Sequence, residues 1–181
     1  MQQWKTSSRQ TILDHNKFLR VEQHVVVLPD GTVIEDWPWL AMPDYVNVVV
    51  ETENGRFLFF RQFKYGVGEV TLATPGGYLE PGEEPLLAAQ RELLEETGYE
   101  AAEWHHLGSF VVDGNRGAGT GHLFLARRAR QIATPNADDL EEQEMLLLTR
   151  AEVETAVSTH QFKLMSWLTA VLLALRTLDS Q

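Results

Sequence analysis

The stretch from residue 77 to residue 99 constrains this chain more than any other, because it sets a turn, a helix and a group of carboxylates in a fixed order. Glycines and prolines fill its first part, and such residues end a strand and let the backbone approach a ligand. Pro85 suits the first turn of a helix, residues 86–96 are good helix formers, and Gly98 suits the C-terminal end. The sequence therefore predicts a helix that begins near Pro85 and ends before Gly98.

Three glutamates share one face of this predicted helix. At about 100° per residue, Glu95 and Glu96 both lie within roughly 60° of Glu92. Small side chains, Ala88 and Ala89, flank this face and would let the helix lie close to a neighbour, and the leucines lie opposite (Leu86, Leu87, Leu93 and Leu94). The acidic face is either solvated or a site for a hard cation, since Mg²⁺ and Mn²⁺ take oxygen ligands shared with substrate phosphates.

The spacing decides between these interpretations. The stretch resembles the Nudix box, Gly-x5-Glu-x7-Arg-Glu-U-x-Glu-Glu-x-Gly-U, in which U is a bulky aliphatic residue. The matching residues are Gly77, Glu83, Arg91, Glu92, Leu93, Glu95, Glu96 and Gly98, and Tyr99 stands at the final U. The resemblance implies an α/β fold, a Nudix-type α/β/α sandwich with a mixed sheet, and the activity of a Nudix hydrolase.

The resemblance also implies roles for individual residues. Glu92, Glu96 and the carbonyl oxygen of Gly76 would hold Mg²⁺ or Mn²⁺, and Glu95 would bind or orient the attacking water. In this family a glutamate from the loop before the last strand can reach the metals or act as base, and two residues are best placed for it (Glu141 and Glu142). The remaining box residues would brace the turn and the helix (Gly77, Glu83, Arg91 and Gly98).

Composition excludes several classes of function. The 181 residues suit one domain, or one domain with an arm, and contain no cysteine, which excludes disulfides and thiolate zinc sites. The net charge is −11 with no visible basic patch, so we expect no nucleic-acid partner, and a phosphate substrate would arrive with cations. Residues 1–20 have no apolar core of a signal peptide and no apolar run could span a membrane, so we expect a cytoplasmic protein without a membrane partner.

The N-terminal region is predicted to be strands over residues 4–37, with a turn at 29–32. This region resembles the ADP-ribose pyrophosphatase branch, in which such a sheet is exchanged between two subunits and helps build the substrate pocket. We therefore expect residues 1–40 to form a β-hairpin arm for homodimerisation and residues 41–181 to form the Nudix domain. Two tryptophans after the hairpin would stack a substrate base or fill a core or dimer interface (Trp37 and Trp39).

Two arginines are candidates for binding substrate phosphate. Arg61 lies in a segment, 61–65, that resembles the Arg-Gln-Tyr-Arg segment of nucleotide-sugar Nudix enzymes, where the arginine faces phosphate or ribose. The alternative is a charge on an edge strand. Arg116 lies in loop 113–121, which contains four glycines and is either a lid or a mobile hairpin tip.

The rest of the chain predicts further regular elements. We expect strands over 45–51, 57–63, 107–112, 122–127 and 145–148 and helices over 151–157 and 162–178.

The expected reaction is metal-dependent hydrolysis of a nucleoside diphosphate linked to another moiety, such as ADP-ribose, to a nucleoside monophosphate and a phosphorylated moiety. The chain departs from the ADP-ribose branch in two places. It has Ala73-Thr74-Pro75-Gly76-Gly77 where many of those enzymes have Glu-Leu-Pro-Ala-Gly, and loop 113–121 lacks their usual proline. The alternatives are a catalytically silent Nudix-fold sensor of a nucleotide metabolite, or an enzyme for dinucleoside polyphosphates or oxidised dNTPs.

Overall fold

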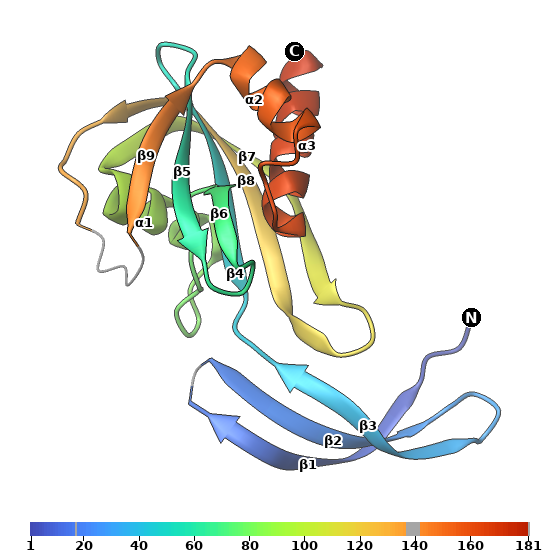
Figure 1. Cartoon of the computed structure of the whole chain (residues 1–181). Coiled ribbons are helices and arrows are strands. Elements are labelled where there is room, and N and C mark those ends of the chain that lie inside the picture. The colour runs from blue at the N-terminus through green and yellow to red at the C-terminus, as the bar shows by residue number, and fades with distance from the viewer. Residues whose placement is uncertain (17, 137–141, 181) are drawn as a thin grey trace. The chain divides into compact units, whose positions relative to one another are not determined.

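The computed structural model describes residues 1–16, 18–136 and 142–180 (Figure 1). The strands are β1 (Lys5–His15), β2 (Leu19–Val27), β3 (Val33–Ala41), β4 (Tyr45–Thr52), β5 (Phe57–Lys64), β6 (Glu69–Ala73), β7 (Tyr99–Asp113), β8 (Gly117–Gln131) and β9 (Gln143–Leu148). The helices are α1 (Pro85–Thr97), α2 (Arg150–Ser158) and α3 (Met165–Asp179). The chain divides into two compact units, Met1–Asp44 with Phe110–Thr120 and Tyr45–Ser109 with Gly121–Gln181.

The larger unit is built on a mixed sheet with helices on both faces. Strand β4 pairs in parallel with β8 and antiparallel with β5, and β5 also pairs antiparallel with β6 and β9. Helix α1 lies on one face and α3 on the other (Figure 1). The predicted α/β fold is therefore confirmed.

Side chains of β4 alternate between two hydrophobic cores, as expected for a strand covered on both faces. Val46, Val48 and Val50 are buried against α1, together with Ala88 and Leu93. Val49 belongs to the other core, with Trp167, Ala170, Val171 and Ala174 of α3. The two cores fix α1, which carries the box glutamates, against the central strand.

Helix α1 begins at Pro85 and ends where Gly98 takes the left-handed conformation, with its N–H donating to the Leu94 carbonyl at 2.8 Å. The prediction of this helix is confirmed. Its buried side chains are Ala88, Ala89, Leu93 and Thr97, whereas Leu86, Leu87 and Leu94 are 40–58% exposed. The helix therefore packs through the alanines beside its acidic face, and three of its four leucines point outward.

The smaller unit contains three antiparallel strands, β1, β2 and β3, where the sequence indicated a hairpin. The additional strand, β1, is exposed at all of its residues. Its first half is polar, with no stripe of apolar residues, and that explains why hydrophobic patterning gives so weak a signal there. Within the same unit, β3 also meets β8 at Leu40 and Gly117.

Strands β7 and β8 are longer than expected, and the turn between them spans only residues 114–116. Most of the glycine-rich stretch is therefore strand. A Cβ at Gly117 would lie 2.6 Å from the Trp39 ring, and one at Gly119 would lie 2.7 Å from the Pro43 carbonyl oxygen. These glycines allow close packing within the smaller unit.

No helix in the described ranges combines the length and the apolar character needed to cross a membrane.

Candidate active site

Arg91 on α1 joins three of the box carboxylates. It makes a two-pronged contact with Glu83, with Nε to Oε1 and Nη2 to Oε2 both at 2.9 Å. Its Nη1 donates to Glu92 Oε1 at 2.8 Å and to Glu95 Oε2 at 3.2 Å. A planar guanidinium suits such paired contacts, and this one is three-quarters buried, with 26% of its side chain exposed.

The same cluster holds the turn before α1, residues 78–84, against the helix. Glu83 Oε2 accepts a hydrogen bond from the Glu80 N–H at 2.9 Å, and Arg91 Nη2 donates to the Tyr78 carbonyl at 3.3 Å. The hydrogen bonds from Arg91 hold the pKa of Glu83 below its usual value, and Glu83 in turn raises the pKa of Arg91. Both side chains therefore stay charged at neutral pH, and the turn keeps its place over the helix.

Two successive glycines bring the backbone against the other carboxylates. A Cβ at Gly77 would lie 2.4 Å from Glu92 Oε1, so only glycine leaves room for that carboxylate. The Gly76 N–H donates to Glu96 Oε2 at 2.8 Å, and Gly76 has a φ of 150° with the Val46 carbonyl oxygen 2.1 Å from an added Cβ. The loop of residues 74–77 thus has Glu92 and Glu96 on one side and β4 on the other.

The oxygen atoms gathered at this site are the ligand type that a hard divalent cation prefers. Glu92, Glu95 and Glu96 supply carboxylate oxygens from one helix face, and the bare Gly76–Gly77 backbone lies beside them. In the ranges that the structure describes, no three His, Asp or Glu side chains already form a cage for a metal. Mg²⁺ suits such a partial set, because it usually keeps several waters and shares substrate phosphates.

The structure places the other candidates from the larger unit as follows. Glu142 is exposed and directly precedes β9, and Glu141 lies outside the described residues. Arg61 pairs through Nη2 with Glu144 Oε2, and the two residues are directly opposite each other on β5 and β9. Sequence reasoning missed Glu144, because its signal is the register of two strands that are more than 80 positions apart.

The candidates from the smaller unit have partners of their own. Trp37 donates from Nε1 to the Asn115 carbonyl at 2.9 Å and makes an edge contact with Trp4. Trp39 stacks on the buried His24, with ring centroids 5.2 Å apart. Arg116 pairs with Asp113 at 3.3 Å in the β7–β8 turn. Their contact with a substrate stays a prediction.

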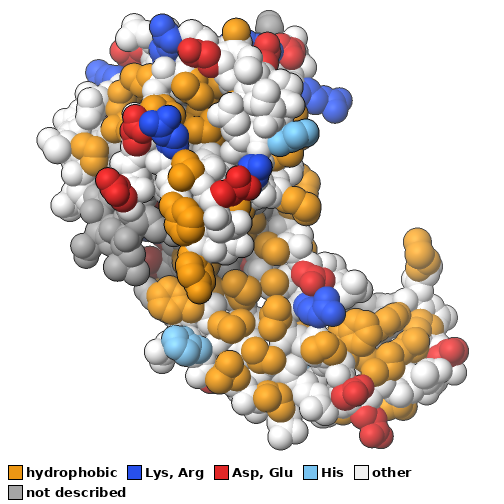
Figure 2. Space-filling model, viewed as in Figure 1, with side chains coloured by type: hydrophobic (Ala, Val, Ile, Leu, Met, Phe, Trp, Pro, Cys, Tyr) orange, Lys and Arg blue, Asp and Glu red, His pale blue; other side chains and the backbone are white. Residues whose placement is uncertain are grey.

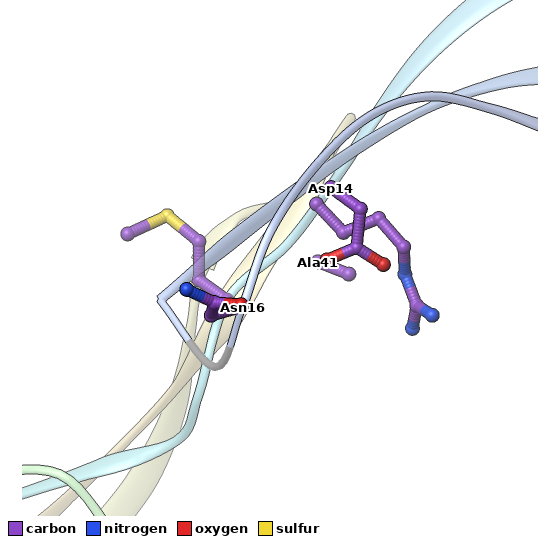
Figure 3. Close-up of a pocket in the computed structure, with 5 residues that line it drawn as sticks. Asp14, Asn16 and Ala41 are labelled. Atoms are coloured by element: carbon purple, nitrogen blue, oxygen red, sulfur yellow. The ribbon is translucent and has the colours of Figure 1, made fainter.

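A hollow of about 270 Å³ also lies in the smaller unit, lined by Asp14, Asn16, Arg20, Ala41 and Met42 (Figure 3). These residues lie at the ends of β1, β2 and β3 or directly after them, and Arg20 is opposite both Asp14 and Ala41. Arg20 also pairs with Glu22 at 3.1 Å. The hollow contains none of the box residues.

Comparison with known proteins points to one family. A family model described as a NUDIX domain matches residues 41–168. The chain is 30% identical to an ADP-ribose pyrophosphatase of Bacillus subtilis over 153 residues, covering 84% of this chain and 80% of that protein. It is also 30% identical over 141 residues to a methanol dehydrogenase activator of Bacillus methanolicus, covering 78% of this chain and 75% of that protein.

A solved structure gives the same fold. The crystal structure of an ADP compounds hydrolase superimposes with a TM-score of 0.83 at 18% identity, covering 100% of this chain and 97% of that one. At this identity the likeness shows the fold alone.

Proposed function

Because this chain belongs to the Nudix family and is a Nudix pyrophosphohydrolase, we propose that it hydrolyses a nucleoside diphosphate linked to a second moiety, with ADP-ribose as the leading substrate. The products would be a nucleoside monophosphate and a phosphorylated moiety. The observation that carries this proposal is the cluster in which Arg91 holds Glu83, Glu92 and Glu95 while Glu96 meets the Gly76 N–H. The B. subtilis relative supports the choice of ADP-ribose.

Glu92, Glu96 and the Gly76 carbonyl oxygen would hold Mg²⁺ or Mn²⁺. When bound, such an ion neutralises phosphate oxygens and lowers the pKa of a coordinated water. Arg91 would keep Glu92 and Glu95 oriented, since its Nη1 donates a charge-assisted hydrogen bond to one oxygen of each.

Glu95 would accept the proton of the attacking water. Half of its side chain is exposed, and its contact with Arg91 uses a single oxygen. Glu141 and Glu142 remain alternatives for this role, as proposed from the sequence. Arg61 would leave Glu144 to contact a substrate phosphate, because an exposed ion pair contributes little stability.

The test is a substrate panel with the wild-type protein and Glu96→Gln. The panel contains ADP-ribose, GDP-mannose, ADP-glucose, NADH, dinucleoside polyphosphates and oxidised dNTPs, each with Mg²⁺ or Mn²⁺. We expect metal-dependent release of a phosphomonoester from ADP-ribose, and a loss of about 100-fold or more in kcat for Glu96→Gln. The amide oxygen can still accept from the Gly76 N–H, so the variant should fold.

The panel also separates the alternatives. A silent sensor would bind a nucleotide without releasing phosphomonoester, and a dNTP or dinucleoside enzyme would prefer the other arms of the panel. An unchanged rate for Glu96→Gln on the best substrate would contradict the metal assignment.

We also propose that the protein is a cytoplasmic homodimer that pairs through residues 1–40. Hydrophobic side chains gather on the smaller unit (Figure 2), and its exposed members include Trp4, Ile12, Leu13 and Val33, each 47–58% exposed. Exposed apolar patches usually mark interaction surfaces. Light scattering at micromolar concentration should give twice the chain mass, and the double variant Ile12→Ser, Leu13→Ser should shift it towards the monomer, whereas a fully active wild-type monomer would contradict the proposal.

A further inference from the structure

Two polar side chains are buried beside the loop of the candidate site. Asn47 on β4 is 4% exposed and Thr74, directly after β6, is 5% exposed. Within the described part of the chain, Asn47 Nδ2 and Thr74 Oγ1 have no hydrogen-bond partner. Native proteins hold few such atoms, because burying a polar group without a partner is unfavourable. The burial of these two polar atoms without a partner therefore needs a physical explanation.

The register of the loop brings the two residues together. Val46 N–H donates to the Gly77 carbonyl and Val48 N–H donates to the Pro75 carbonyl, both at 2.9 Å. These bonds set Asn47 opposite Gly76, and an added Cβ at Gly76 would indeed lie 3.0 Å from the Asn47 Cα. Thr74 is two residues from Gly76, so it is the diagonal neighbour of Asn47.

The pair lies on the opposite side of the loop from α1. Side chains alternate along β4, so Asn47 shares the face of Val49, which packs in the core beneath α3. Val46 and Val48 face the core beneath α1, the helix that carries Glu92 and Glu96. The loop is therefore held by carboxylates from one side and faces two unpartnered polar atoms on the other.

Thr74 is one of the positions at which this chain differs from the Glu-Leu-Pro-Ala-Gly segment. Thr74 stands at the leucine of Glu-Leu-Pro-Ala-Gly. A leucine would fill the space without any polar atom to satisfy.

We propose that Asn47 and Thr74 bind one buried water, and that the two are positioning residues for the carbonyl oxygen of Gly76. Asn47 Nδ2–H donates to the water and the water donates to Thr74 Oγ1, which satisfies both atoms. The second water hydrogen is then available to a backbone carbonyl of the loop. This inference rests on the proposed role of the Gly76 carbonyl as a metal ligand.

The test compares Thr74→Val and Thr74→Ser in the full-length protein. We expect Thr74→Val to lower Tm by about 3 °C, because the amide of Asn47 and the water lose a partner. We expect it also to raise the Kd for Mn²⁺, measured by calorimetry without substrate, by about tenfold. Thr74→Ser keeps the hydroxyl and should bind Mn²⁺ like the wild type.

The matched control is Thr52→Val on β4, the strand that carries Asn47. Thr52 is 8% exposed and bonds with Arg56 in the β4–β5 turn, so its loss should lower Tm without changing Mn²⁺ affinity. A crystal structure of the wild type should show a water within hydrogen-bond distance of Asn47 Nδ2 and Thr74 Oγ1.

Three results would overturn the inference: a higher Tm for Thr74→Val, an unchanged Kd for Mn²⁺ in that variant, or a dry pair in the crystal. A wild-type protein that binds no Mn²⁺ would instead contradict the proposed function, so the two failures are distinguishable.

Discussion

Gly77 and Glu92 are in direct contact where the turn meets α1. A Cβ at position 77 would lie 2.4 Å from Glu92 Oε1 and 2.6 Å from its Cδ. The same Oε1 accepts a hydrogen bond from Arg91 at 2.8 Å. The carboxylate is therefore held between a guanidinium and bare backbone, and the missing side chain at position 77 determines where it lies.

Gly77→Ala should weaken metal binding while the protein stays folded. The three atoms nearest to the added methyl all belong to the far end of the Glu92 side chain, which can rotate away at little cost in stability. We expect the Kd for Mn²⁺ to rise by at least about tenfold and kcat to fall, with Tm within a few degrees of the wild type. Calorimetry and thermal unfolding measure the two effects separately.

Gly66→Ala is the control, because no atom lies within 4 Å of its added Cβ and its φ is not positive. It should bind Mn²⁺ like the wild type. If Gly77→Ala does so as well, the placement of Glu92 does not depend on Gly77.

Gly76→Ala should act in the opposite way and reduce stability. Its added Cβ would lie 2.1 Å from the Val46 carbonyl oxygen, which is main chain and cannot rotate away, and its φ of 150° disfavours any side chain. We expect the free energy of unfolding to fall by about 2–4 kcal/mol, measured by urea denaturation. A loss below about 1 kcal/mol would contradict the close approach of the loop to β4.

The box could be predicted from the sequence because its information is local. Helix α1 follows from Pro85, a run of helix formers and Gly98, and the spacing of the glutamates gives their common face. The need for glycine at positions 76 and 77, in contrast, comes from residues that are distant in the sequence. It depends on Glu92, which is 15 positions from Gly77, and on Val46, which is on a strand that precedes the box.

Packing partners from distant strands were the part that the sequence did not reveal. The outward position of Leu86, Leu87 and Leu94 follows from the packing of α1 against the buried valines of β4 through its alanines. Likewise, the Arg61–Glu144 pair depends on the antiparallel pairing of β9 with β5. Single-sequence periodicity contains neither relationship.

Glu83→Gln should make the free energy of unfolding depend less on pH in the acid range. Arg91 lowers the pKa of Glu83 in the folded protein below the 4.5 of the unfolded chain. The carboxylate therefore stabilises the protein at pH values above 4.5, and this contribution is lost as the pH falls through the folded-state pKa. We expect the wild type to exceed Glu83→Gln by about 1–2 kcal/mol in unfolding free energy at pH 7. The difference should shrink as pH falls below 4.5.

Glu84→Gln controls for the loss of one negative charge at the same turn, since Glu84 makes no capping hydrogen bond with its side chain. It should leave the unfolding free energy at pH 7 nearly unchanged. A pH-independent difference between the wild type and Glu83→Gln would show that Glu83 acts through packing instead of charge.

Arg61→Ala should lower kcat/KM by about 10- to 100-fold, because a guanidinium binds a diphosphate through paired charge-assisted hydrogen bonds. Arg130→Ala is the matched control. Arg130 pairs with Glu100 at 2.7 Å, and its side chain is 62% exposed, close to the 54% of Arg61 in its pair with Glu144. Losing an exposed ion pair alone changes stability by less than about 1 kcal/mol, so the control should keep its activity.

Arg116→Ala, measured beside them, tests the β7–β8 turn as the competing phosphate ligand. If only Arg116→Ala lowers kcat/KM, the phosphate is bound from that turn, and Arg61 serves as the cross-strand partner of Glu144.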